Sequence, residues 1–125
     1  GYVYKRQPQT LAPTIPIDSE LEFGDISDTL IDELEMLMPF GAGNPEPLLL
    51  ARDVKVVSSK IVGQNHRRMV LSQAAGYANA TIPAIHFNVN DDDAKKFRFD
   101  RMVFRLNWNR WNGKKTAQIV VEDLL

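Results

Sequence analysis

Hydrophobic residues first follow a helical repeat, between Ser27 and Met38. The apolar positions form one stripe of a helix with 3.6 residues per turn, at Leu30, Ile31, Leu34, Leu37 and Met38. The acidic positions Asp28, Asp32 and Glu35 lie on the opposite face. Ser27 suits the N-cap, and Pro39 cannot continue the helix. The pattern predicts an acidic amphipathic helix over residues 27–38.

After Pro47 the repeat changes to the two-residue alternation that is typical of β-strands. It is clearest where Met102, Phe104, Leu106 and Trp108 alternate with Val103, Arg105 and Asn107. Five strands are predicted, at Leu48–Ile61, Met69–Gln73, Ile82–Val89, Met102–Trp108 and Thr116–Val121. Asn112-Gly113 is the strongest hairpin signal, and Asp91–Lys96 predicts a short helix between strands three and four.

Five strands with a short helix between the third and fourth is the order expected of an OB barrel. An SH3-like barrel or a small α+β sandwich would give a similar string of elements. We therefore predict a mainly β fold, a five-stranded OB-like barrel preceded by an amphipathic helix.

The stretch from Pro39 to Pro47 holds three prolines, two glycines and an asparagine. Such a run suits neither a helix interior nor a strand, and it differs from a flexible Gly/Ser linker, so we expect a shaped connector. The predicted organisation is an extended lead-in from an upstream domain (1–26), a helix with its connector (27–47) and the OB domain (48–125). Because the chain begins at Gly1 without an initiator Met, we expect it to be a piece of a larger protein.

Composition limits the class of protein. A chain of 125 residues with 44% hydrophobic content supports one core. The absence of cysteine excludes disulfides and thiolate metal sites, and no apolar run reaches membrane-spanning length. We expect a cytoplasmic protein with no membrane partner and no signal peptide.

The formal net charge of −1 conceals an uneven distribution. Residues 1–50 contain two basic and nine acidic residues, whereas residues 51–125 contain thirteen basic and seven acidic ones. The basic part could bind a polyanion. Alternatively, the two halves neutralise each other within one fold.

Several segments resemble one family when taken in order. The connector with its preceding methionine, Met38–Pro47, resembles the loop that opens the C-terminal OB domain of RecJ-like single-stranded-DNA-specific exonucleases, in the DHH phosphoesterase superfamily. The resemblance extends over residues 17–124. It continues in Ile17-Asp18-Ser19-Glu20-Leu21, Val62–Arg68, Ala84–Asn88, and Leu106, Asn109, Gly113 and Gln118-Ile119. The family usually has an apolar residue at the position of Arg67 and a smaller one at that of His86.

The chain carries no catalytic or metal site in this interpretation. It has no Asp-His-His run and only two histidines, His66 and His86, each without a nearby carboxylate at ligand spacing. Asp91–Asp93 is interpreted as a solvated helix start rather than a metal site. The resemblance implies an upstream DHH-type catalytic domain that holds Mg²⁺ or Mn²⁺ and degrades DNA from the 5′ end in repair and recombination.

OB barrels bind single strands by contacting phosphates with Lys and Arg and by stacking bases on aromatic side chains. Trp111, near the last turn, is the best stacking candidate. Trp108 falls on the same side of the alternating strand as Phe104 and Leu106, which indicates a core residue. His86 is expected on the outer face without a fixed role. The candidate DNA-binding residues are Lys60, His66, Arg67, Arg68, Arg105, Asn107, Asn109, Arg110, Trp111, Lys114 and Lys115; the alternative is an ordinary solvated face.

The connector has two interpretations. It could brace the barrel against the upstream catalytic domain, through Phe40, Gly41, Gly43, Asn44 and Glu46, or it could be a rigid turn with no partner. Two functions therefore remain open. The first is a non-catalytic single-stranded-DNA-binding domain, with single-strand-binding protein as a further partner. The second is a protein-interaction or scaffold module that braces a nuclease core without touching DNA.

Overall fold

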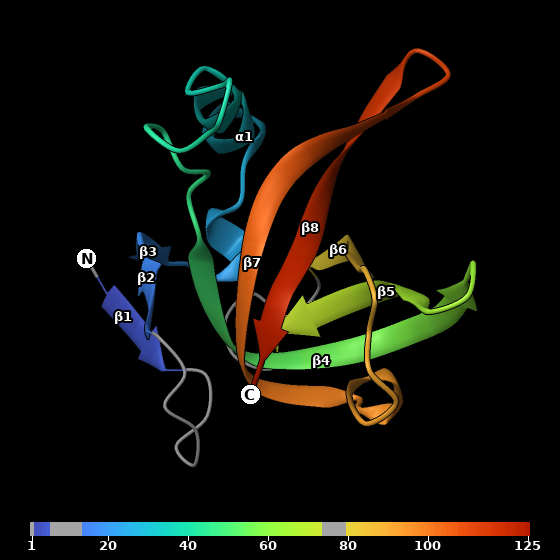
Figure 1. Ribbon diagram of the computed structural model, residues 1–125. Coiled ribbons are helices and arrows are strands. Elements are labelled where there is room, and N and C mark those ends of the chain that lie inside the picture. The colour runs from blue at the N-terminus through green and yellow to red at the C-terminus, as the bar shows by residue number, and fades with distance from the viewer. Residues whose placement is uncertain (1, 6–13, 74–79) are drawn as a thin grey trace.

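The computed structural model describes residues 2–5, 14–73 and 80–125 (Figure 1). Strands β1 (Tyr2–Lys5) and β2 (Thr14–Ile17) form an antiparallel pair at the N-terminal end. The short strand β3 (Ser19–Glu20) runs parallel to the beginning of β4. A 3-10 turn η1 (Phe23–Asp25) and the helix α1 (Asp28–Glu35) follow before the barrel begins.

The barrel consists of five strands: β4 (Leu49–Val62), β5 (His66–Gln73), β6 (Thr81–His86), β7 (Arg98–Trp111) and β8 (Lys114–Leu124). Their order is β4-β5-β6-β8-β7, and β7 pairs back onto β4, which closes the barrel. Only the β6–β8 pairing is parallel among these five strands. The 3-10 turn η2 (Asp93–Lys95) lies between β6 and β7. The predicted mainly β, five-stranded OB-like barrel is confirmed.

Strand β7 is longer than the alternation predicted, whereas β4 has the predicted length and is shifted by one residue, and the pairing of each strand contains a bulge. The pairing of β4 with β5 shifts between Val56 and Ser58, and the pairing of β7 with β8 shifts between Val103 and Phe104. The β7–β8 hairpin turns at Asn112 and Gly113, both with positive φ, as the Asn-Gly signal predicted. This hairpin projects well beyond the closed part of the barrel (Figure 1).

Helix α1 packs on the barrel through a shorter apolar stripe than predicted. Ile31 is fully buried, and Leu30 and Leu34 pack against the main core. Ser27 caps the helix by accepting a hydrogen bond from the Leu30 N–H. The prediction that Leu37 and Met38 lie in the apolar face of the helix was wrong, because α1 ends at Glu35 and both side chains are exposed.

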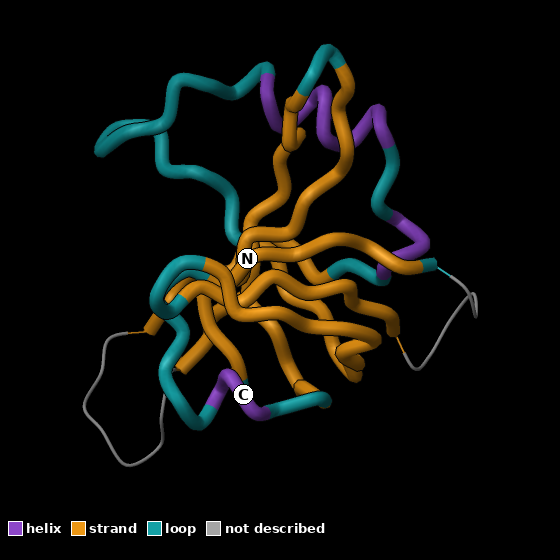
Figure 2. Tube along the Cα trace, turned by 90° about the vertical axis from the view of Figure 1, so that its right-hand side faces the viewer, coloured by secondary structure: helices purple, strands orange, loops and turns teal. Residues whose placement is uncertain are grey.

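The connector from residue 39 to 47 stands out from the barrel as an ordered loop (Figure 2). Gly41 and Asn44 exchange backbone hydrogen bonds of 2.9 and 3.0 Å, which makes a tight turn. The Asn44 side-chain amide donates to the carbonyls of Leu37 and Pro39, which ties the turn to the end of α1. The connector is therefore shaped by its own hydrogen bonds. Among the described residues, no helix is long and apolar enough to cross a bilayer.

Candidate nucleic-acid interface

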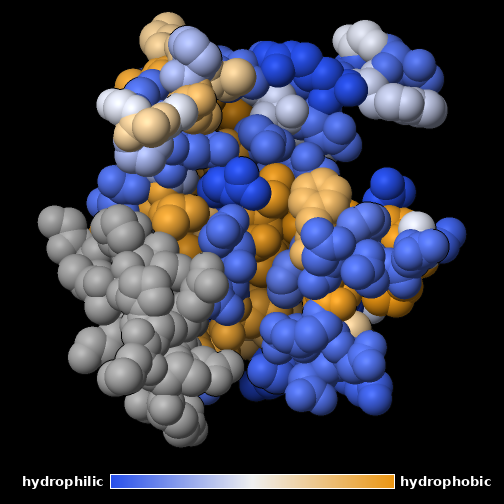
Figure 3. Space-filling model, in the orientation of Figure 1, coloured by the Kyte–Doolittle hydropathy of each residue, from blue (hydrophilic) through white to orange (hydrophobic). Residues whose placement is uncertain are grey.

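A groove of about 880 Å³ lies where the β4–β5 hairpin and the β7–β8 hairpin diverge. Figure 1 shows the two hairpins pointing apart, and Figure 3 shows the indentation between them on the molecular surface. The groove exists because β6 bridges the two hairpins over only two residue pairs, Ala84–Ile119 and Ile85–Val120. Its lining residues are Val62, His66, Arg68, Pro83, Ala84, Ile85, Phe87, Asn109, Trp111, Lys114, Thr116 and Gln118.

Five of the residues predicted to bind DNA share this groove: His66, Arg68, Asn109, Trp111 and Lys114. They come from segments more than forty positions apart in the sequence. A sixth, Lys60, is exposed opposite Arg68 in the β4–β5 ladder and extends the same face. Within the described ranges, Lys60, Arg68 and Lys114 form no ion pair, so their charges are available to an anionic ligand.

The groove also exposes apolar and aromatic surface. Trp111 is 75% exposed at the end of β7, and Phe87 is 53% exposed just after β6. Pro83 of β6 adds exposed aliphatic surface between the hairpins, and the nearly buried Ile85 lies beside it in the lining. Phe87 was not among the predicted DNA-binding residues, because it fell inside the strand predicted for Ile82–Val89. The turn-prone Asn88 that follows Phe87 was the available signal for an earlier strand end.

Arg67, one of the predicted DNA-binding residues, is buried inside the barrel and does not line the groove. Its side chain is 1% exposed, because it shares the inward parity of Met69 and Leu71. The guanidinium donates to the carbonyls of Asp93 (3.0 Å) and Lys96 (2.7 Å) and to Ser59 Oγ (3.2 Å). It also lies 5.3 Å from the centre of the Phe97 ring. Arg67 therefore anchors the segment that carries η2.

His86 is the register partner of Arg67 across β5 and β6, and it is buried rather than on the outer face as predicted. Its parity follows Ile82 and Ala84, which point into the core. Burial lowers the pKa of both side chains, since desolvation disfavours their charged forms. The two positions at which the chain departs from the family pattern are thus neighbours inside the barrel.

The remaining predicted residues, Arg105, Asn107, Arg110 and Lys115, do not line the groove. Arg105 lies 3.2 Å from Glu46 of the connector and 3.4 Å from Glu122. The Arg110 guanidinium donates to both carboxylate oxygens of Glu35 at 2.8 Å, which lowers the pKa of Glu35 and raises that of Arg110. Each of these two arginines therefore has an acidic partner within the fold.

Lys115 and Trp108 belong to the contact between the hairpin and α1. Trp108 is buried, as its parity predicted, and its indole N–H donates to Asp32 at 2.9 Å. The Lys115 ammonium lies 4.4 Å from the centre of the Trp108 ring and 3.7 Å from Asp32. Helix α1 thus neutralises one face of the hairpin, and the opposite face borders the groove.

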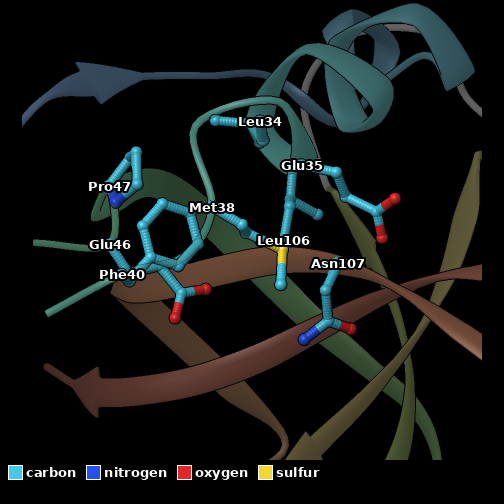
Figure 4. A pocket seen from close by; sticks show the side chains of 8 residues that line it. All are labelled: Leu34, Glu35, Met38, Phe40, Glu46, Pro47, Leu106 and Asn107. Carbon is cyan, nitrogen blue, oxygen red and sulfur yellow. The ribbon is translucent and has the colours of Figure 1, made fainter. Parts of the chain in front are cut away.

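A second hollow, of about 160 Å³, lies between α1, the connector and β7 (Figure 4). Phe40 and Glu46, two of the predicted interdomain residues, line it together with Leu34, Glu35, Met38, Pro47, Leu106 and Asn107. Beside it the end of α1 exposes Met36, Leu37 and Met38, and Figure 3 shows hydrophobic residues gathered over this region at the upper left. The interdomain role of Phe40, Gly41, Gly43, Asn44 and Glu46 stays a prediction.

In the described part of the chain, no group of three or more His, Asp or Glu side chains is arranged to hold a metal ion. Asp91–Asp93 leads into η2, where the Asp93 N–H donates to the Asn90 side chain at 2.7 Å and the Asp93 carboxylate pairs with Lys96. These contacts give Asp93 a structural role at the start of η2.

Comparison with known families matches residues 17–123 to the RecJ OB domain. The chain belongs to the RecJ OB domain family. Among curated relatives, the single-stranded-DNA-specific exonuclease RecJ of Bacillus subtilis is 25% identical over 115 residues, which cover 89% of the chain. The corresponding RecJ of Salmonella typhimurium is 22% identical over 122 residues, or 94% of the chain. The matched residues make up only 14% and 20% of these two relatives.

Proposed function

We propose that this RecJ OB domain binds single-stranded DNA in the groove between its two hairpins and has no catalytic activity of its own. The observation that carries the proposal is the convergence of unpaired cations and exposed aromatic surface in one groove. Arg68 and Lys114 supply charge for phosphates, and Trp111 supplies a face on which bases can stack. An OB barrel that binds single strands uses the same combination.

The proposal extends to the parent protein, in keeping with the names of the two relatives. The domain would bind the single-stranded substrate of a RecJ-like exonuclease that degrades DNA from the 5′ end in repair and recombination. An upstream DHH-type domain would hold Mg²⁺ or Mn²⁺ and perform the hydrolysis. Single-strand-binding protein would be a further partner, and the protein would act in the cytoplasm.

Fluorescence anisotropy with the 125-residue chain and a labelled dT15 strand tests DNA binding. The expected result is saturable binding that is weaker for a duplex of equal length and that falls linearly on a plot of log affinity against log salt. The variant Arg68→Ala plus Lys114→Ala should lower this slope by about 1.4, since each single-strand phosphate contact contributes about 0.7.

The matched control is Lys55→Ala plus Arg101→Ala, which removes two exposed cations outside the groove. It should leave the slope unchanged. No binding by the wild-type chain at low salt, or an equal loss in both double variants, would contradict the proposed site.

A second function, the brace without DNA contact, is favoured by the apolar surface at the end of α1. Met36 is 81% exposed, and Leu37 and Met38 are exposed beside it, next to the hollow that Phe40 lines. Contiguous apolar surface of this kind typically marks a protein contact. Binding to the separately produced upstream domain, together with no affinity for dT15, would favour this function over the first.

A further inference from the structure

Phe87 is a large apolar side chain that the fold leaves half exposed and holds in place. The Phe87 side chain is 53% exposed, and it lines the groove together with Arg68 and Lys114. Single exposed apolar side chains are ordinary on protein surfaces, so exposure alone assigns Phe87 no role. What distinguishes Phe87 is that it lines one groove together with Trp111 and the two exposed cations.

The turn that carries Phe87 is fixed by three contacts with the β4–β5 hairpin. The Asn88 N–H donates to His66 Nδ1 at 3.1 Å, and the Val89 N–H donates to the Asn65 carbonyl at 2.8 Å. The Phe87 ring itself meets the His66 ring in an edge-to-face contact, with 5.4 Å between their centres and 76° between their planes. Phe87 is therefore held ready before any ligand arrives, which reduces the entropy lost on binding.

His66 receives two constraints in this arrangement. Its Nδ1 accepts the Asn88 N–H, and its ring packs against Phe87. Gly63 lies directly against it, because a Cβ at that position would be 3.2 Å from His66 Cδ2. The imidazole is thus a spacer between the β4–β5 turn and the turn after β6, and it sets the direction of the Phe87 ring.

We propose that Phe87 is a base-stacking residue of the groove and that His66 is its positioning residue. Phe87 lies against the β4–β5 side and Trp111 ends a strand of the other hairpin, so the two aromatic residues offer stacking faces from both sides of the groove. Stacking on a phenyl ring accepts any base, whereas Arg68 and Lys114 contact the backbone. This inference rests on the proposed function, since it assigns the bases to a place in the same groove.

A comparison of two strands separates stacking from phosphate contact. The probes are labelled dT15 and a strand of the same length and charge in which every base is replaced by an abasic site. Phe87→Ala should weaken binding to dT15 by about 5- to 150-fold, the range for loss of one base–aromatic stack. Its affinity for the abasic strand and its salt slope should equal those of the wild type.

Five further variants test the assignment. Phe87→Trp should retain the preference for dT15 over the abasic strand, whereas Phe87→Leu, which keeps apolar volume without a π face, should lose most of it. His66→Ala should reduce the same preference, and the Phe87→Ala, His66→Ala double variant should be no weaker than Phe87→Ala alone. Arg68→Ala should instead weaken both strands by the same factor.

Each outcome bears on one claim. One outcome is that Arg68→Ala binds dT15 more weakly than the wild type while Phe87→Ala binds it equally well. DNA binding in the groove would then stand, and the stacking role of Phe87 would be overturned. Equal losses on both strands for Phe87→Ala would also overturn it. Equal losses on both strands for His66→Ala would make His66 a phosphate contact instead of a positioning residue. No binding by the wild type would overturn the proposed function and this inference with it.

Discussion

At the scale of single residues, Arg67 is expected to stabilise the fold and not to bind DNA directly. Arg67→Ala removes the donor shared by the Asp93 and Lys96 carbonyls and empties a buried site. We expect the free energy of unfolding to fall by about 2–4 kcal/mol, since buried groups left unpaired are costly. Urea unfolding measures this loss. The exposed neighbour Arg68→Ala is the control, with an expected change within about 0.5 kcal/mol, and equal losses in the two variants would contradict the anchoring role.

His86 should make the stability depend on pH. Desolvation lowers the pKa of its imidazole in the folded state, although Asp93, Asp123 and Glu122 oppose the shift and Arg67 reinforces it. The unfolded chain then binds a proton that the native state excludes, so stability should fall as the pH drops below about 6.5, the ordinary histidine value. Urea unfolding between pH 7.5 and 5.5 measures this slope. His86→Gln should show a shallower slope over that window and an unchanged one above pH 8.

At the scale of elements, α1 and the β7–β8 hairpin should behave as one unit because Trp108 joins them. Trp108→Ala should destabilise the domain by about 3–5 kcal/mol, as for other large buried aromatics. Trp108→Phe and Asp32→Ala both remove the hydrogen bond between the indole and the carboxylate, so their effects should be non-additive when combined. Urea unfolding measures all of these changes. Trp111→Ala, at an exposed position, is the control, and equal losses at the two tryptophans would contradict this coupling.

The elements also show what local pattern can predict. Two-residue alternation located all five strands, and Pro39 with the Asn-Gly pair located the helix end region and the last hairpin. His86 was placed on the outer face although Ala84, two positions before it, points inward, and Arg67 was grouped with the exposed cations although Met69, two positions after it, is buried. The groove could not be predicted, because it depends on how little of β6 pairs with β8, which is a non-local property.

At the scale of the whole molecule, the uneven charge distribution has two consequences at once. Acidic residues from the first fifty positions pair with basic residues from the rest, as in Glu35–Arg110, Glu46–Arg105, Asp32–Lys115 and Glu20–Arg52. These pairs neutralise the side of the molecule near α1 and the connector. They leave Lys60, Arg68 and Lys114 without acidic partners in the described ranges, on and beside the groove. Mutual neutralisation therefore describes the α1 side of the molecule, and binding of a polyanion stays a prediction for the groove side.

This division predicts which cations govern the salt dependence of DNA binding. Arg105→Ala plus Arg110→Ala removes as much formal charge as the groove variant, but from side chains already paired with carboxylates. The slope of log affinity against log salt should therefore stay within experimental error of the wild type, since few counterions are released where a phosphate is not contacted. The measurement is anisotropy with dT15 across a salt series, with thermal unfolding to show that the variant folds. If the slope for Arg105→Ala plus Arg110→Ala fell by about 1.4, as expected for the groove variant, these two arginines would contact phosphates. The DNA strand would then continue from the groove over the hairpin onto the α1 side.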